Sequence, residues 1–139
     1  MSVSLVAFLT ARLDEDQAVA REAAGLAECW VAEEPAIGVV LVDGEPLIEG
    51  HITGLTAHIA RHDPARVLRE VRAGRKLIAA YEDRLSWVHD YSDPGSDYED
   101  PGGLKLKWEE GATAALLAAI QLRAAIYSEH QDYRQEWAV

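Results

Sequence analysis

Two histidines four residues apart are the best candidates for chemistry in this sequence. His58 and His62 lie in a segment whose pattern predicts a helix, so both imidazoles would project from one face and share a divalent metal ion. Zinc peptidases with this spacing need a glutamate after the first histidine, and this chain has Ile59 there. The sequence therefore predicts, as one alternative, a divalent-metal site without a general base, and it predicts no other cofactor. Candidates for a further metal ligand are His51, His89, Asp63 and Glu49.

The other interpretation gives both histidines structural roles. At a helix C-terminus, His62 would bond to the last carbonyl groups and interact favourably with the helix dipole. His58 would then pack, half-buried, against a neighbouring β-hairpin. Both interpretations stay open, because the spacing does not by itself bring a third ligand close.

Basic side chains gather in the same part of the chain. Residues 57–76 contain six lysines and arginines against two acidic residues, whereas the whole chain has a net charge of −11. Guanidinium groups in a row can bind phosphate or carboxylate, but an exposed row also forms weak ion pairs with the protein's own acids. We expect either an anionic ligand or partner here, or a solvated face paired with acids of the first helix. This basic stripe consists of Arg66, Arg69, Arg72, Arg75 and Lys76.

An aspartate followed by a proline would position the histidines and the stripe. Asp63 is a good N-cap and Pro64 a good first helical residue, so a short helix over 53–62 is predicted to end where a long helix over 64–90 begins. The apolar residues of the long helix fall on the side opposite the basic stripe. The stripe is therefore expected on the solvent side.

The remaining patterns predict two further long helices and one hairpin. Helical spacing of leucine and alanine indicates helices over 4–27 and 108–127. Runs over 37–42 and 45–50 flank Asp43-Gly44, a strong signal for a type I′ turn. We therefore expect an α+β, mainly helical fold, in which three long helices and a short helix pack around one β-hairpin.

The chain is expected to form a single domain over residues 1–139. Two Pro-Gly steps and four acidic residues predict an acidic flexible loop at about 92–103. The tail over 133–137 is expected to dock, because it carries two large aromatic residues. The lone Cys29 is expected to be buried and inert.

Three segments spread along the chain carry a family resemblance. The chain opens on Leu5–Asp16, carries HIARHDPARVLREV at 58–71 and closes on HQDYRQEW at 130–137. These segments resemble a family of small proteins of unknown function from actinobacteria and actinophages, marked by the central motif and an HxDYRxEW-like tail. The resemblance implies a compact fold and implies no catalytic residues.

Composition and charge exclude several classes of protein. No run of about 18 apolar residues could span a bilayer and no secretory signal opens the chain, so we expect no membrane association and a cytoplasmic location. The net charge of −11 argues against direct nucleic-acid binding. There is no Gly-rich phosphate loop and no nucleophile elbow, so we expect no catalytic residues.

We therefore expect a non-enzymatic interaction or regulatory protein, with a protein partner or a second copy (a homodimer) as the bound species. Its binding residues would be the basic stripe together with Tyr133 and Trp137. One alternative is a domain that binds an anionic small molecule or a divalent metal around His58, His62 and the stripe. Another is an acidic, phage-related nucleic-acid mimic that inhibits a basic partner. The aromatic residues from which a self-association patch would be built are Trp87, Tyr91, Trp108, Tyr133 and Trp137.

Overall fold

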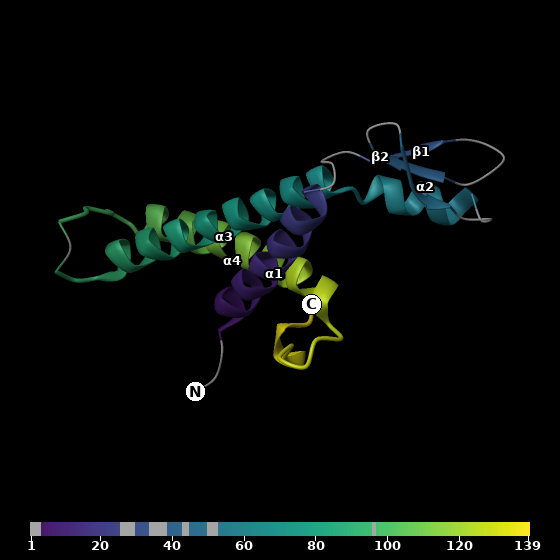
Figure 1. Ribbon diagram of the computed structural model, residues 1–139. Coiled ribbons are helices and arrows are strands. Elements are labelled where there is room, and N and C mark those ends of the chain that lie inside the picture. Colours follow the sequence, from purple (N-terminus) through teal and green to yellow (C-terminus); the bar gives the residue numbers. More distant parts are fainter. Residues whose placement is uncertain (1–3, 26–29, 34–38, 43–44, 50–52, 96) are drawn as a thin grey trace. The chain divides into compact units, whose positions relative to one another are not determined.

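The computed structural model describes residues 4–25, 30–33, 39–42, 45–49, 53–95 and 97–139 (Figure 1). Its helices are α1 (Leu5–Ala24), α2 (Thr53–Arg61), α3 (Pro64–Ser92) and α4 (Leu104–Ala124), followed by the 3-10 turns η1 (Ala125–Tyr127) and η2 (Gln135–Trp137). Its strands are β1 (Trp30–Glu33), β2 (Val39–Val42) and β3 (Glu45–Glu49). None of the helices in these ranges has the length and apolar character needed to cross a membrane.

The chain divides into two compact units. The first unit combines Met1–Arg12 with Ala73–Val139, and the second unit is Leu13–Arg72. The prediction of a single domain over 1–139 stays a prediction. We describe each unit by itself.

The second unit contains the strands. They form an antiparallel sheet in the order β1-β2-β3, with Trp30 opposite Val42 and Val39 opposite Glu49. Helix α2 packs against β1 and β2. The register of β2 and β3 shifts between Val40 and Leu41, beside Pro46, which cannot donate a backbone hydrogen bond.

The predicted α+β class, with helices packed around one β-hairpin, is wrong. The described chain is mainly helical, and a third strand, β1, turns the expected hairpin into a small sheet. In the second unit the sheet packs on α2, and the described residues of the first unit include no strand. A two-stranded hairpin alone is marginally stable, which is the physical reason for the third strand. The turn predicted at Asp43-Gly44 and the buried state predicted for Cys29 lie outside the described residues.

In the first unit, α3 and α4 lie side by side and are joined by residues 93–103 (Figure 1). Asp100 stabilises the N-terminal end of α4, because its carboxylate accepts the backbone N–H groups of Lys105 at 3.1 Å and Leu106 at 2.9 Å. The hydrogen bond from Leu106, above all, holds the pKa of Asp100 below its usual range. Gly103 precedes the helix with φ 66°, a backbone conformation that favours glycine.

The start of α1 and the chain's last residues close the first unit. Phe8, Ala124 and Trp137 are buried together, and Leu5, Tyr127 and Tyr133 pack against them. The Phe8 ring lies 5.0 Å from the Trp137 ring and 6.0 Å from the Tyr133 ring, measured between centroids. Trp137 is only 6% exposed, so the tail is part of the core of this unit.

Candidate functional site

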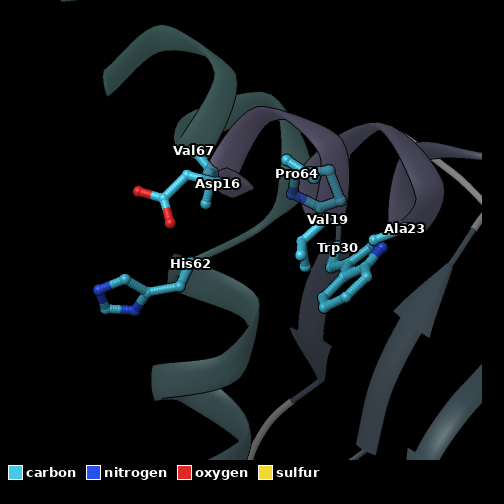
Figure 2. Close-up of a pocket in the computed structure, with 8 residues that line it drawn as sticks. Asp16, Val19, Ala23, Trp30, His62, Pro64 and Val67 are labelled. Carbon is cyan, nitrogen blue, oxygen red and sulfur yellow. The ribbon is translucent and has the colours of Figure 1, made fainter. Parts of the chain in front are cut away.

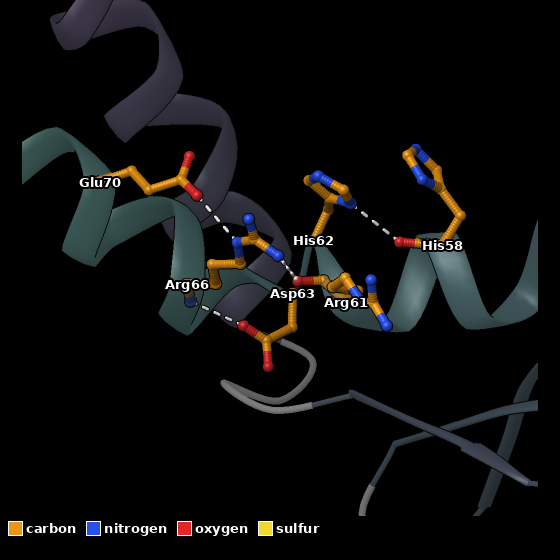
Figure 3. A network of polar contacts seen from close by, with 6 residues as sticks. All are labelled: His58, Arg61, His62, Asp63, Arg66 and Glu70. Atoms are coloured by element: carbon orange, nitrogen blue, oxygen red, sulfur yellow. Dashed lines mark hydrogen bonds and ion pairs between the residues drawn. The ribbon is translucent and has the colours of Figure 1, made fainter.

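The junction between α2 and α3 holds the two histidines and the first arginine of the basic stripe (Figure 3). Asp63 caps α3 as predicted, because its Oδ1 accepts the backbone N–H of Arg66 at 2.6 Å. His62 donates from Nδ1 to the His58 carbonyl oxygen at 2.9 Å, and the two imidazole centroids are 4.4 Å apart. Both histidines are exposed, so the expected burial of His58 is wrong.

The histidine pair gains no third ligand in the described part of the chain. No three His, Cys, Asp or Glu side chains there lie close enough to hold a metal ion together. His51 lies outside the described residues. Metal binding at His58 and His62 therefore stays a prediction.

One residue of the basic stripe is bonded to other residues of the junction, and the other four are exposed. Arg66 bonds to Glu70 through Nε at 2.8 Å and donates to the Arg61 carbonyl oxygen at 3.2 Å, so it stabilises the junction (Figure 3). Arg69 and Arg72 in the second unit are exposed, and neither forms an ion pair or side-chain hydrogen bond with a described residue. Arg75 and Lys76, in the first unit, are also exposed.

Beside the junction, the second unit has a cavity of about 290 Å³ (Figure 2). Asp16 and His62 lie on one side of the cavity, and Trp30 lies across from them. The Trp30 indole N–H is buried and has no acceptor among the described residues. The other residues that line the cavity are Val19, Ala20, Ala23, Pro64 and Val67. The cavity is thus mainly apolar with a polar edge.

The predicted binding residues of the tail serve the fold. Trp137 is buried against Phe8, and the half-buried Tyr133 contacts the same ring. His130 bonds through Nε2 to the Arg12 guanidinium, whose Cζ lies 5.5 Å from the centre of the Phe8 ring. These contacts fix the tail within its own unit, and a binding role for Tyr133 and Trp137 stays a prediction.

An exposed apolar surface, which was not predicted as a whole from the sequence, lies along α4. Four large apolar side chains on one side of this helix and η1 are strongly exposed: Leu104 by 73%, Trp108 by 63%, Leu122 by 64% and Ile126 by 64%. The exposed Gly111 and Ala115 lie between them on the same side. We call the side formed by Leu104, Trp108, Gly111, Ala115, Leu122 and Ile126 the α4 outer face.

The α4 outer face could have been found from the spacing of its residues. Positions 104, 108, 111, 115, 118 and 122 alternate steps of four and three, which is the pattern of a helix that packs on another helix. Of these residues, only Trp108 was predicted from the sequence to belong to a self-association patch. In the structure the core side of α4 is different and includes the buried Ile120 and Ala124.

A charged pair holds Trp108 in place on this face. Arg84 of α3 donates from Nη1 to both carboxylate oxygens of Glu109, at 3.2 and 3.1 Å. Glu109 is buried, and the Arg84 Cζ lies 5.6 Å from the centre of the Trp108 ring. A hollow of about 230 Å³ beside them is lined by Tyr91, Leu104, Lys105, Trp108 and Glu109. Trp108 is thus both exposed and oriented, as side chains that dominate binding interfaces are.

Comparison with known proteins gives the family and no relative of known activity. No curated protein and no solved structure matches the chain. One family model, for a family of unknown function, matches residues 2–139, which is nearly the whole sequence. The match confirms the prediction that the chain belongs to a family of unknown function. The chain therefore belongs to the family of unknown function DUF6221.

Proposed function

We propose that this protein is an interaction protein that binds another protein through the α4 outer face. The observation that carries the proposal is the exposure of four large apolar side chains on one side of a single helix. Exposed apolar side chains that occur singly are ordinary, but a continuous apolar surface marks a binding site. Trp108 further supports a binding role for this face, because tryptophan is enriched among the residues that contribute most to the free energy of binding.

The charges around the α4 outer face also support a protein partner. Lys105 and Lys107 are exposed beside its N-terminal end, and Glu110 is exposed beyond them. This arrangement resembles a protein interface, which has an apolar centre and a polar rim. The basic stripe of α3 is a separate charged surface on which this proposal does not depend.

The proposal predicts loss of binding when the face is made acidic. A tagged chain carrying Trp108→Glu and Leu122→Glu should lose partner proteins that the unaltered chain retains, measured by quantitative mass spectrometry of affinity-purified complexes. Ala18→Glu is the matched control, because Ala18 is exposed on α1 and is not among the residues that line the cavity of the second unit. If the double variant and the unaltered chain retain the same proteins in the same amounts, the proposal is wrong.

The cavity in the second unit supports a second candidate function, the binding of a small molecule. Its volume of about 290 Å³ is at the lower end of the range for small-molecule sites, and such sites are mainly apolar with a few polar groups. The Trp30 N–H could donate to a carbonyl or carboxylate, and the His62 imidazole is a polar group at the edge. We propose a small, mainly apolar acid as the ligand class.

A thermal-shift screen with small aromatic and aliphatic carboxylic acids tests this second function. A ligand at 100 times its dissociation constant should stabilise the protein by about 2.7 kcal/mol. Ala23→Leu, which fills the cavity, should remove the shift and leave the behaviour of the α4 outer face unchanged. A screen in which no acid raises the melting temperature, or in which Ala23→Leu responds equally, contradicts this function.

A further inference from the structure

We propose that the α4 outer face binds the same face of a second copy of this chain, with the two α4 helices antiparallel. This inference rests on the function proposed above and names the partner.

The spacing indicates that a helix covers the face. Steps of four and three from position 104 to position 125 average 3.5 residues, which keeps one seam of an α-helix facing a partner helix over several turns. A flat or irregular partner would require no such repeat. The seam takes Leu104, Trp108, Gly111, Ala115 and Leu122 from the α4 outer face and adds the half-buried Ala118 and Ala125.

The sizes of the side chains make the seam complementary to itself in the antiparallel direction. When two copies are related by a two-fold axis between Ala115 and Ala118, Leu122 of one copy lies opposite Gly111 of the other. Trp108 of one copy then lies opposite Ala125 of the other. Trp108 and Leu122 thus each meet a small residue, and the alanines at the centre allow the helices to approach closely. At the ends of the face, Leu104 lies opposite Glu129 and Ile126 lies opposite Lys107.

The charges select the antiparallel direction and the second copy. Parallel helices would place Lys105 and Lys107 directly beside the same lysines of the other copy. In the antiparallel pair, Lys105 instead lies near the exposed Glu129 of the other copy, just beyond the end of the face. The helix dipoles also oppose each other in this arrangement, which is favourable. The surface is therefore complementary to itself in shape and in charge.

The oligomeric state of the purified full chain is the first test. Light scattering is expected to give twice the monomer mass of 15.3 kDa at micromolar concentration. Leu122→Glu, which introduces a charge at the seam, should give the monomer mass and an unchanged circular dichroism spectrum. Ala18→Glu should keep the dimer. A monomer mass for the unaltered chain at 100 µM, or a dimer of Leu122→Glu, overturns the inference.

The direction of the helices is tested by a distance between spin labels. In a Cys29→Ala background shown to keep the dimer mass, a label at the exposed position Ser128→Cys should report about 35 Å between the two copies, since each label lies some twelve residues from the axis. A parallel pair would give a distance close to the ~10 Å that separates packed helices, and that result overturns the antiparallel arrangement.

The two proposals fail in different ways. A chain that is monomeric by light scattering but loses a different protein when Trp108 and Leu122 are made acidic overturns self-association and supports the interaction function. A monomeric chain that loses no protein in that experiment overturns both.

Discussion

Trp137→Ala is expected to lower the free energy of unfolding by about 3 kcal/mol, because it empties a buried site between α1 and the end of α4. Trp137 is 6% exposed, and its ring centroid lies 5.0 Å from that of Phe8. Urea unfolding followed by circular dichroism measures the change as a lower midpoint at an unchanged slope. Phe8→Ala should have a similar effect, and the two changes together should cost less than their sum, since the rings contact each other.

Trp108→Ala is the matched control for this prediction. Trp108 is 63% exposed, so its removal should change the free energy of unfolding of the monomer by less than about 0.5 kcal/mol. The comparison must be made at low protein concentration, because association through the α4 outer face would otherwise add apparent stability. If Trp137→Ala were as mild as Trp108→Ala, the tail would not pack on Phe8 as described.

Removal of the partner of Glu109 is expected to have the second largest effect. Arg84→Met leaves a carboxylate whose side chain is 10% exposed without its cation, so we expect a loss of about 2 kcal/mol. The loss should be smaller than for a fully buried pair, because the Arg84 side chain is 32% exposed and solvent screens it. Urea unfolding at neutral pH measures this change.

A double-mutant cycle checks that the effect of Arg84→Met comes from the pair. Arg84→Met combined with Glu109→Leu should recover most of the lost stability, because no charge is then left buried. Glu70→Gln is the matched control, since it breaks an exposed ion pair with Arg66 at 2.8 Å and should cost no more than about 0.5 kcal/mol. Equal losses for Arg84→Met alone and for the double variant would contradict the role given to this pair.

The helices could be predicted from local signals, whereas their packing could not. Asp63 and Pro64 predicted the start of α3. The helix predicted over 4–27 begins where the Ser4 Oγ accepts the Ala7 N–H at 3.1 Å. These signals work because a cap and its helix lie within three residues of each other. Strand β1 was missed because Trp30–Glu33 is short and its pairing with β2 depends on residues further along the chain.

The candidate site was harder to predict because exposure depends on the tertiary structure. Trp108 and Trp137 are the same residue type near two helix ends, yet one is exposed on α4 and the other is buried against Phe8. In the sequence, only the steps of four and three along α4 distinguish a binding face from a core face. In an alanine-rich helix this periodicity is hard to recognise, because apolar residues occur on every side. The basic stripe was visible in the sequence because charge and period suffice to define it, and a ligand for it stays a prediction.

A photo-crosslinking amino acid in place of Ala115 tests the α4 outer face most directly, because that position lies at its centre and carries no large side chain. Irradiation of cells that produce the chain is expected to yield a covalent adduct with a protein, of twice the chain's mass if a second copy is bound. The same amino acid at Ala18, an exposed alanine of α1, should yield none. Adducts absent at both positions, or equally abundant at both, would contradict the account of α4 as the binding surface of this protein.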